Sequence, residues 1–324
     1  MKKILISLAI IICILCGCAQ QEKLPDLSEE SKTAQKIELK NNQYENLCVP
    51  TLLTKIKNDY FIVDCYHNQI LVSEDVTKSI EEWKVLTDQI NKGHTICSDG
   101  VVYLCDDTEN NRILVFAKQG EEFYYLDAFD NIGKRPHFIS YNEKNDSFYV
   151  LSSLTGEFYI FKRKKDTYEV YLDKCVQIPQ LDGVYVRTFT FIDGLIYMPA
   201  GNGFIYEVDP DSFEILSFQA LPNELGGPTQ LIKIGDYYYM TVSTDRNVNP
   251  DFANLVRVKS PDDFIDGDYE SIRDRFCNDG TPYVISEVDG IFYLAYHADD
   301  GKNCMWQFGA DKAGEISNIK RSFE

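Results

Sequence analysis

Apolar and polar positions alternate over most of the chain, and this alternation indicates β-strands. Short segments such as 123–126 (FYYL), 157–161 (EFYIF) and 214–218 (EILSF) are rich in aromatic and β-branched residues, which favour strands, and helical periodicity is scarce. The counts of 21 tyrosines and 19 phenylalanines point the same way. The pattern therefore predicts an all-β protein.

The predicted strands recur in units. Each unit has a short strand, a turn with Asp, Asn or Gly, an aromatic second strand, a polar bend and a third strand, and a fourth outer strand often follows. The turn aspartates are 40, 47, 47, 43 and 53 residues apart: Asp59, Asp99, Asp146, Asp193, Asp236 and Asp289. Six such units predict a six-bladed β-propeller of four-stranded antiparallel blades. In the fifth unit, Ser260 and Pro261 predict the cap and first turn of a brief helix.

The bend between the second and third strands carries the clearest motif. In the second unit, Asp107-Thr108-Glu109-Asn110-Asn111-Arg112-Ile113 resembles the Asp-Thr-x-Asn-x-Arg-Ile run of NHL-type propellers, and residues 64–70 are a weaker copy. Residues 207–215 are similar to the Asp-Pro-x-Thr turn of YVTN and quinoprotein-like propellers. The resemblance extends from about Cys48 to the C-terminus and implies a fold, but no activity.

The acidic residues of this bend allow two interpretations. Asp106 and Asp107 could bind a divalent cation, but the loop lacks the alternating acidic residues and the distal Glu of a calcium loop. An Asp that accepts backbone N–H groups and pairs with Arg112 explains the same residues. We therefore expect a structural bend.

The N-terminus is typical of an exported protein. Met1–Lys3 is basic, and the almost entirely apolar run Ile4–Leu15 is shorter than the roughly 20 residues of a membrane-spanning helix. Leu15-Cys16-Gly17-Cys18 resembles the lipobox of bacterial lipoproteins, which implies a lipid on Cys18; a plain secretory signal cleaved nearby is the alternative. We predict a lipoprotein signal peptide over residues 1–18, a flexible polar tether over 19–40 and the propeller over 41–324, on the extracytoplasmic face of the cell membrane.

Charge and cysteine content exclude several classes of function. A net charge of −19 would be repelled by phosphate backbones, so nucleic acid is not expected as a partner. Seven cysteines follow Cys18, an odd number without CxxC spacing, which signals neither a disulfide framework nor a zinc site, although one or two disulfides remain open. The common nucleophile, zinc-protease, phosphate-loop and dinucleotide motifs are missing from the sequence. No cofactor is therefore predicted.

A propeller gathers the loops that enter its innermost strands on the same face as the bends between second and third strands, and ligands usually bind there. His94 and His137 fall at such entrances, while His67 and His297 fall in bends. Arg135, Arg187 and Arg246 are also expected at this face, where guanidinium groups could bind a carboxylate, sulfate or phosphate; ordinary pairing with Asp and Glu is the alternative. The candidate binding residues are His94, Arg135, His137, Arg187 and His297.

Two functions remain open. We favour a non-catalytic module, held at the membrane through Cys18, that binds a small anionic ligand, a glycan or an envelope protein. The alternative is a metal-dependent lyase or hydrolase, as NHL-like folds imply, in which His94, His137 and His297 bind a divalent metal.

Overall fold

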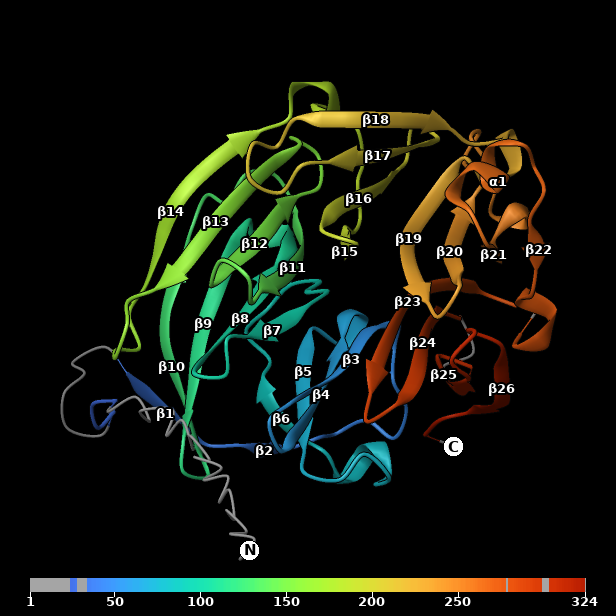
Figure 1. Cartoon of the computed structure of the whole chain (residues 1–324). Helices are drawn as coiled ribbons and strands as arrows, with labels where there is room; N and C mark the ends of the chain where they lie inside the picture. Colours follow the sequence, from blue (N-terminus) through green and yellow to red (C-terminus); the bar gives the residue numbers. More distant parts are fainter. Residues whose placement is uncertain (1–23, 28–33, 278, 299–302, 324) are drawn as a thin grey trace, which may run out of the picture.

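The structure is a computed structural model that describes residues 24–27, 34–277, 279–298 and 303–323. Six antiparallel sheets are arranged around a central axis, so the predicted all-β, six-bladed propeller is confirmed (Figure 1). Helix α1 (Pro261–Ile265) begins at Ser260, as predicted, with a capping box between Ser260 and Asp263. Within the described ranges, no helix is long and apolar enough to cross a membrane. The lipobox and Cys18 lie outside the described residues.

Each blade has four strands that follow one another from the axis outward. Blades 1 to 3 consist of β3 (Pro50–Ile56), β4 (Asp59–Asp64), β5 (Gln69–Ser73) and β6 (Lys84–Thr87); β7 (Ile96–Ser98), β8 (Val102–Asp107), β9 (Arg112–Gln119) and β10 (Glu122–Phe129); and β11 (Pro136–Asn142), β12 (Ser147–Ser152), β13 (Glu157–Arg163) and β14 (Val170–Gln177). Blades 4 to 6 consist of β15 (Thr190–Ile192), β16 (Leu195–Ala200), β17 (Phe204–Val208) and β18 (Ile215–Ala220); β19 (Gly227–Ile234), β20 (Tyr237–Thr244), β21 (Asn254–Val258) and β22 (Glu270–Ser271); and β23 (Thr281–Val288), β24 (Ile291–His297), β25 (Met305–Ala310) and β26 (Ile316–Arg321).

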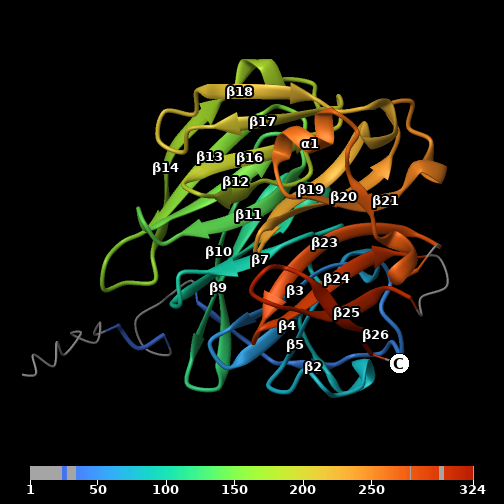
Figure 2. The ribbon, with the colours of Figure 1, turned by 45° about the vertical axis from the view of Figure 1, so that its right-hand side comes forward.

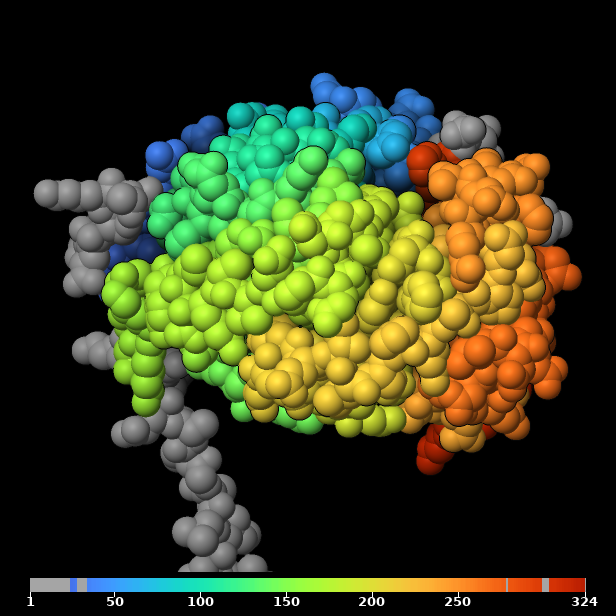
Figure 3. Space-filling view, turned by 90° about the horizontal axis from the view of Figure 1, so that it is seen from above, coloured from blue at the N-terminus to red at the C-terminus, as the bar shows by residue number. Residues whose placement is uncertain are grey.

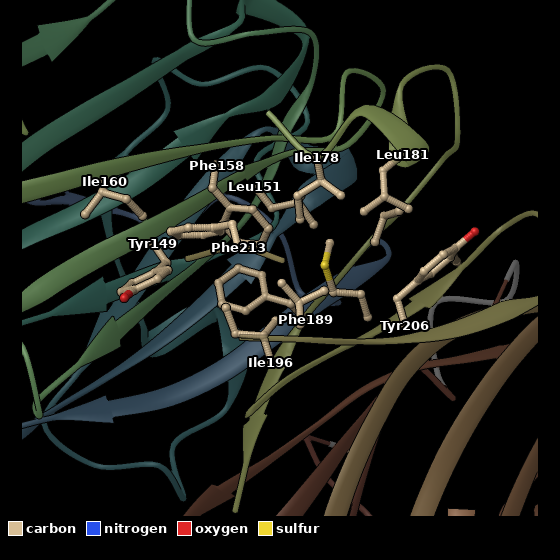
Figure 4. Packing of buried hydrophobic residues seen from close by; sticks show 14 residues of the cluster. Tyr149, Leu151, Phe158, Ile160, Ile178, Leu181, Phe189, Ile196, Tyr206 and Phe213 are labelled. Atoms are coloured by element: carbon tan, nitrogen blue, oxygen red, sulfur yellow. The ribbon is translucent and has the colours of Figure 1, made fainter. Parts of the chain in front are cut away.

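The core lies between neighbouring blades. The second strands β8 and β12 are buried along their whole length, because both of their faces pack against another blade. Between blades 3 and 4, Tyr149, Phe158, Phe189 and Phe213 form an aromatic cluster (Figure 4). The outer strand β18 alternates between half-buried and exposed positions. This difference explains why the strand pattern in the sequence is nearly continuous in some segments and alternating in others.

The ring closes without a strand shared between its first and last blades. Blade 1 is built from residues 50–87 and blade 6 from residues 281–321. Asp289 of blade 6 receives hydrogen bonds from Lys55 (2.9 Å) and from the Tyr60 hydroxyl (2.7 Å) of blade 1. A cluster of buried apolar residues joins the same two blades. Side-chain contacts therefore close the propeller.

Near the axis, a hydrogen bond between a side chain and the backbone crosses every junction between blades. The six links are Thr51 Oγ1 to His94 O, Ile139 N to Thr95 Oγ1, His137 Nδ1 to Arg187 O, Thr188 Oγ1 to Thr229 O, Gln230 with both backbone groups of Ile285, and Ser286 Oγ to Leu53 O. Most of these groups are buried, so each link satisfies polar atoms that water does not reach. The links form a closed axial ring.

The N-terminal segment crosses the outer rim of blades 2 and 1. Its strand β1 (Gln35–Ile37) pairs with β10, and β2 (Lys40–Asn41) pairs with β6, so these two blades have five strands each (Figures 1 and 2). Contacts with the propeller thus begin before residue 41, where we expected the domain to start. In blades 3 and 4, by contrast, β14 and β18 are the outermost strands of their sheets, on the rim that faces the viewer in Figure 3.

Replacing Gln230 by methionine tests the axial ring. The substitution keeps the side-chain length but leaves the buried N–H and C=O of Ile285 without their partners at 2.7 and 3.1 Å. Because each unsatisfied buried group costs about 1–3 kcal/mol, we expect the free energy of unfolding to fall by about 2–5 kcal/mol, measured by urea unfolding. Gln177→Met on the exposed edge of β14 is the matched control and should change it by less than about 0.5 kcal/mol. Equal effects of the two substitutions would contradict this role of Gln230.

Candidate functional site

The bend between β8 and β9 of blade 2 is held by Asp107. Its buried carboxylate accepts hydrogen bonds from the backbone N–H of Asn91 (2.6 Å), the side-chain amide of Asn110 and the guanidinium of Arg112. Thr108–Asn110 form a 3₁₀ turn, and Asn111 ends the turn in the left-handed conformation with a φ of 52°. The bend is therefore structural, as we expected.

The left-handed asparagine of the bend binds the next blade. Asn111 Oδ1 accepts the backbone N–H of Arg135 at 2.8 Å, and Asn68 Oδ1, at the same place in blade 1, accepts that of Lys92 at 3.0 Å. Asparagine tolerates a positive φ better than most residues, which explains why it occupies both positions. The motif thus fixes two basic residues at the entrances of neighbouring blades.

Asp106, the other aspartate of the bend, fixes the backbone at His94. This fully buried carboxylate accepts the backbone N–H groups of His94 (2.9 Å) and Thr95 (2.6 Å), and the hydroxyl groups of Thr95 (2.7 Å) and Thr108 (2.6 Å). From the sequence we considered Asp106 only as part of a cation site or a bend. The one sequence feature that sets Asp106 apart from the other bend residues is its position directly before Asp107, the first residue of the motif.

The hydrogen bonds around His94 show that its Nδ1 is a donor. The Thr108 hydroxyl donates to Asp106, so it accepts from His94 Nδ1 at 3.0 Å, and Nδ1 carries the proton. His94 Nε2 lies 3.9 Å from Cys65 Sγ. Burial raises the pKa of Cys65 to about 12, so the thiol keeps its proton at neutral pH.

His137 also donates a hydrogen bond through Nδ1. Its Nδ1 lies 3.0 Å from the carbonyl oxygen of Arg187, which can only accept, so Nδ1 donates. Its Nε2 accepts from the Tyr185 hydroxyl at 3.1 Å, and the Tyr283 hydroxyl is 3.5 Å away. Burial, followed by the neighbouring His94 and Arg187, lowers the pKa of His137 well below its usual value of 6.5. His137 is therefore neutral at pH 7.

The two imidazole rings stack at the centre of the propeller. Their centroids are 3.7 Å apart at an angle of 27°, and Tyr185 and Tyr283 contact the ring of His137. Burial also raises the pKa of Tyr283 well above its usual value, so this hydroxyl stays protonated. We call the group made by His94, His137, Tyr185, Arg187 and Tyr283 the axial cluster.

Basic side chains lie over aromatic rings at the partly exposed side of the axial cluster. Arg187 and Arg135 lie 4.5 and 5.7 Å from the ring centroid of Tyr185, and Lys92 lies 3.5 Å from that of Tyr66, a residue that is 46% exposed. Arg135 also pairs with Glu109 at 3.1 Å, but its buried Nε has no hydrogen-bond partner among the described residues. In the same ranges, neither Lys92 nor Arg187 forms an ion pair with a carboxylate. Positive charge is therefore concentrated at this side.

The structure brings four of the five candidate residues together: His94, Arg135, His137 and Arg187. His297 lies at the edge, where it contacts Tyr66 with ring centroids 5.4 Å apart. The other predicted residues of this face have structural partners: His67 binds Asp64 at 2.7 Å and stacks on Tyr44, and Arg246 donates to the carbonyl of Leu221 at 2.7 Å.

Sequence reasoning missed Tyr185, Tyr283 and Cys65, which contact the histidines from three different blades. Aromatic residues are so frequent in this chain that no local pattern distinguishes these two tyrosines from core residues. Among the described residues, no group of three or more His, Cys, Asp and Glu side chains is placed to hold a metal ion. In the described structure, the proposed metal ligands His94, His137 and His297 therefore do not form such a group.

Comparisons with known proteins place the chain in a class of folds. No protein-family model and no curated protein matches it. Among solved structures, it is similar to a catalytically inactive histidine-to-alanine variant of virginiamycin B lyase from Staphylococcus aureus with quinupristin, at 14% identity and a TM-score of 0.57 over 89% of this chain and 87% of that chain. A 6-phosphogluconolactonase candidate from Bacteroides fragilis has 11% identity and a TM-score of 0.59 over 84% and 83% of the two chains. A streptogramin B lyase has 12% identity and a TM-score of 0.56 over 90% and 89%.

These identities are low enough that the likenesses show the fold alone. The chain is a six-bladed β-propeller, and its solved neighbours include lyase and lactonase-like proteins. The finer resemblance to NHL and YVTN propellers stays a prediction.

The neutral state of His137 predicts how stability depends on pH. The unfolded chain binds a proton at this histidine with a pKa near 6.5, whereas the folded chain does not until the pH is much lower. Stability contributed by this group should therefore be complete above pH 6.5 and decrease by about 1.4 kcal/mol per unit below it. Urea unfolding at pH 7 and pH 5 measures the loss. In His137→Asn, the loss between these two values should be smaller by about 2 kcal/mol; an unchanged loss would contradict a neutral, buried His137.

Proposed function

We propose that the protein is a lipid-anchored, extracytoplasmic binding module that holds a small anionic ligand at the axial cluster. The observation that carries this proposal is the position of Lys92, Arg135 and Arg187 over aromatic rings, with no carboxylate paired to Lys92 or Arg187 in the described ranges. In a chain with a net charge of −19, basic groups near the surface normally find acidic partners. Without such a partner in the described ranges, Lys92 and Arg187 keep donors for a carboxylate, sulfate or phosphate.

The surroundings of the cluster support a ligand that is bound rather than transformed. The closest buried carboxylate, Asp106, already accepts four hydrogen bonds, so it does not compete for the basic groups. His137 donates through Nδ1 to the axial ring and accepts through Nε2 from Tyr185, so both of its nitrogens have partners in the protein. A glycan or an envelope protein could present the same anionic group.

An acid–base enzyme is the second candidate. The observation in its favour is the neutral His137, whose Nε2 faces two tyrosine hydroxyls beside a guanidinium group. Solved propellers of similar fold include proteins named as lyases and as a lactonase candidate. Consumption of quinupristin or 6-phosphogluconolactone by the purified chain, with loss of that activity in His137→Gln, would favour the enzyme. Metal content of the purified chain would show whether a divalent ion takes part.

Replacing Arg187 tests the binding module. We expect inorganic phosphate, sulfate or citrate to bind the purified chain, and Arg187→Gln to weaken the best of these probes at least tenfold by isothermal titration calorimetry, since a charge-assisted hydrogen bond contributes about 1.5–3 kcal/mol. Arg187→Lys should lose less, because it keeps the charge without the planar fork. Lys233→Gln is the matched control: this exposed lysine pairs with Asp193 and should leave binding unchanged. Binding that survives Arg187→Gln unchanged would overturn the proposed site.

The lipid anchor has its own test. We expect the full-length chain expressed in a bacterium to partition with membranes through a lipid, and Cys18→Ala to be released as soluble protein. Mass spectrometry of the N-terminal peptide should find the lipid on Cys18. Membrane association of Cys18→Ala through a lipid would show that the lipid site lies elsewhere.

A further inference from the structure

The N-terminal segment is attached to the propeller at a second place, well before β1. The side-chain amide of Gln119 accepts the backbone N–H of Leu27 at 3.0 Å and donates to the carbonyl of Pro25 at 3.1 Å. The Leu27 side chain is 5% exposed and packs with Ala117 and Tyr124. We call these contacts the Gln119 clamp. A segment with such burial and paired backbone groups is held on the blade rather than tethered loosely.

The Gln119 clamp lies at the end of blade 2 that is farthest from the axial cluster. Strand β9 begins at Arg112, in the bend beside the cluster, and ends at Gln119. The Gln119 amide also reaches the Tyr168 hydroxyl at 3.4 Å, in the turn between β13 and β14 of blade 3. These turns between third and fourth strands are on the opposite face of the propeller from the entrances that carry His94, Arg135 and His137.

Chain length then limits how the propeller can face a membrane. Pro25 lies 7 residues after Cys18, so the two residues are at most about 25 Å apart when the chain is fully extended. The outer strand β10 has 8 residues, which cover about 26 Å between the two faces. A lipid on Cys18 could therefore reach the bilayer beside the axial cluster only with residues 19–24 fully extended along the rim. The face that carries the clamp needs no such extension.

We propose that the Gln119 clamp orients the lipid-anchored propeller with its axial cluster away from the bilayer, so that its anionic ligand comes from solution and not from lipid headgroups. This inference rests on the proposed function, and in particular on the lipid at Cys18. It goes beyond that function because it names the source of the ligand and the face that is open to a partner.

Energy transfer from each face to the membrane tests the orientation. The full-length lipidated chain is placed in phosphatidylcholine liposomes with an acceptor dye on a headgroup, and a donor dye is attached to an azido amino acid at Lys165 or Asp182. These exposed positions flank β14 at its two ends. Because about 26 Å separates the ends of this strand, transfer from position 165 should be about twofold stronger than from position 182. Equal transfer, or stronger transfer from position 182, would overturn the orientation.

Variants of the clamp separate its role from that of the anchor. In Gln119→Ala combined with Leu27→Ala, the difference between the two positions should shrink, whereas Gln177→Ala, at the other end of blade 3, should preserve it. Fast hydrogen exchange at the Leu27 amide in Gln119→Ala, against slow exchange in the unchanged chain, checks the clamp in folded protein. A Leu27 amide that exchanges fast in both would overturn it.

The source of the anion is tested on the same liposomes. Inorganic phosphate should bind the anchored chain as tightly as the detergent-released chain, and addition of phosphatidylglycerol to the liposomes should not compete with it. Competition by the lipid would overturn the inference. Loss of the chain from the liposomes would instead contradict the lipid anchor of the proposed function. A chain that stays on the liposomes but shows equal energy transfer from positions 165 and 182 would contradict only the orientation.

Discussion

The closed ring of hydrogen bonds around the axis is the constraint on which the rest of this propeller depends. Blades 1 and 6 share no strand, so nothing in the backbone ladder prevents the ring from opening between them. Each of the six axial links joins one innermost segment to the next through one side chain. Apolar packing between neighbouring blades holds them together farther from the axis. Because buried polar groups that lose their partners are costly, the ring also fixes how near the axis each blade lies. His137 belongs to this ring and to the axial cluster at once. Its Nδ1 stabilises the fold, and only its Nε2 is left to face the neighbouring tyrosines.

The bend motif also positions residues of the axial cluster and the basic residues beside it. Asn68 and Asn111 each bind the backbone of the following blade, and this contact places Lys92 and Arg135 at equivalent entrances. Within blade 2 itself, Asp106 fixes the backbone at His94. Residues at equivalent positions of two blades, Asn68 and Asn111, thus position residues that differ between the blades, Lys92 and Arg135. A repeat of structural bends can in this way present a non-repeating set of side chains at the axis.

The sequence predicts much of the fold because its signals are local. The turn aspartates, the alternation of strands and the cap at Ser260 each report on a few adjacent residues, and the structure has a blade or a helix at each of them. The candidate residues His94, Arg135, His137 and Arg187 could be placed on one face by topology alone. Their contacts could not be predicted, because the stacking of His94 on His137 and the approach of Tyr185 and Tyr283 depend on how far the blades lie from the axis. His297 was expected beside them, but it is the last residue of β24, and its ring contacts the outer Tyr66.

Two basic residues at the axial cluster, Lys92 and Arg187, lie over aromatic rings and not beside carboxylates in the described structure. A guanidinium over an aromatic ring gains about 0.5–2 kcal/mol, without the geometric demand of a bidentate ion pair. Arg187 lies over the ring of Tyr185 in this way and needs no carboxylate partner. The carboxylate oxygens of Asp106, beside the histidines, accept hydrogen bonds from backbone N–H and hydroxyl groups instead. Deeper in the cluster, the pKa of His137 is lowered and those of Cys65 and Tyr283 are raised by burial, so none of these three is charged at neutral pH. In the described ranges, Lys92 and Arg187 are not paired with a carboxylate, whereas Glu109 offsets the charge of Arg135 at 3.1 Å. In a chain so acidic elsewhere, these two basic groups support the anionic ligand that we propose for the axial cluster.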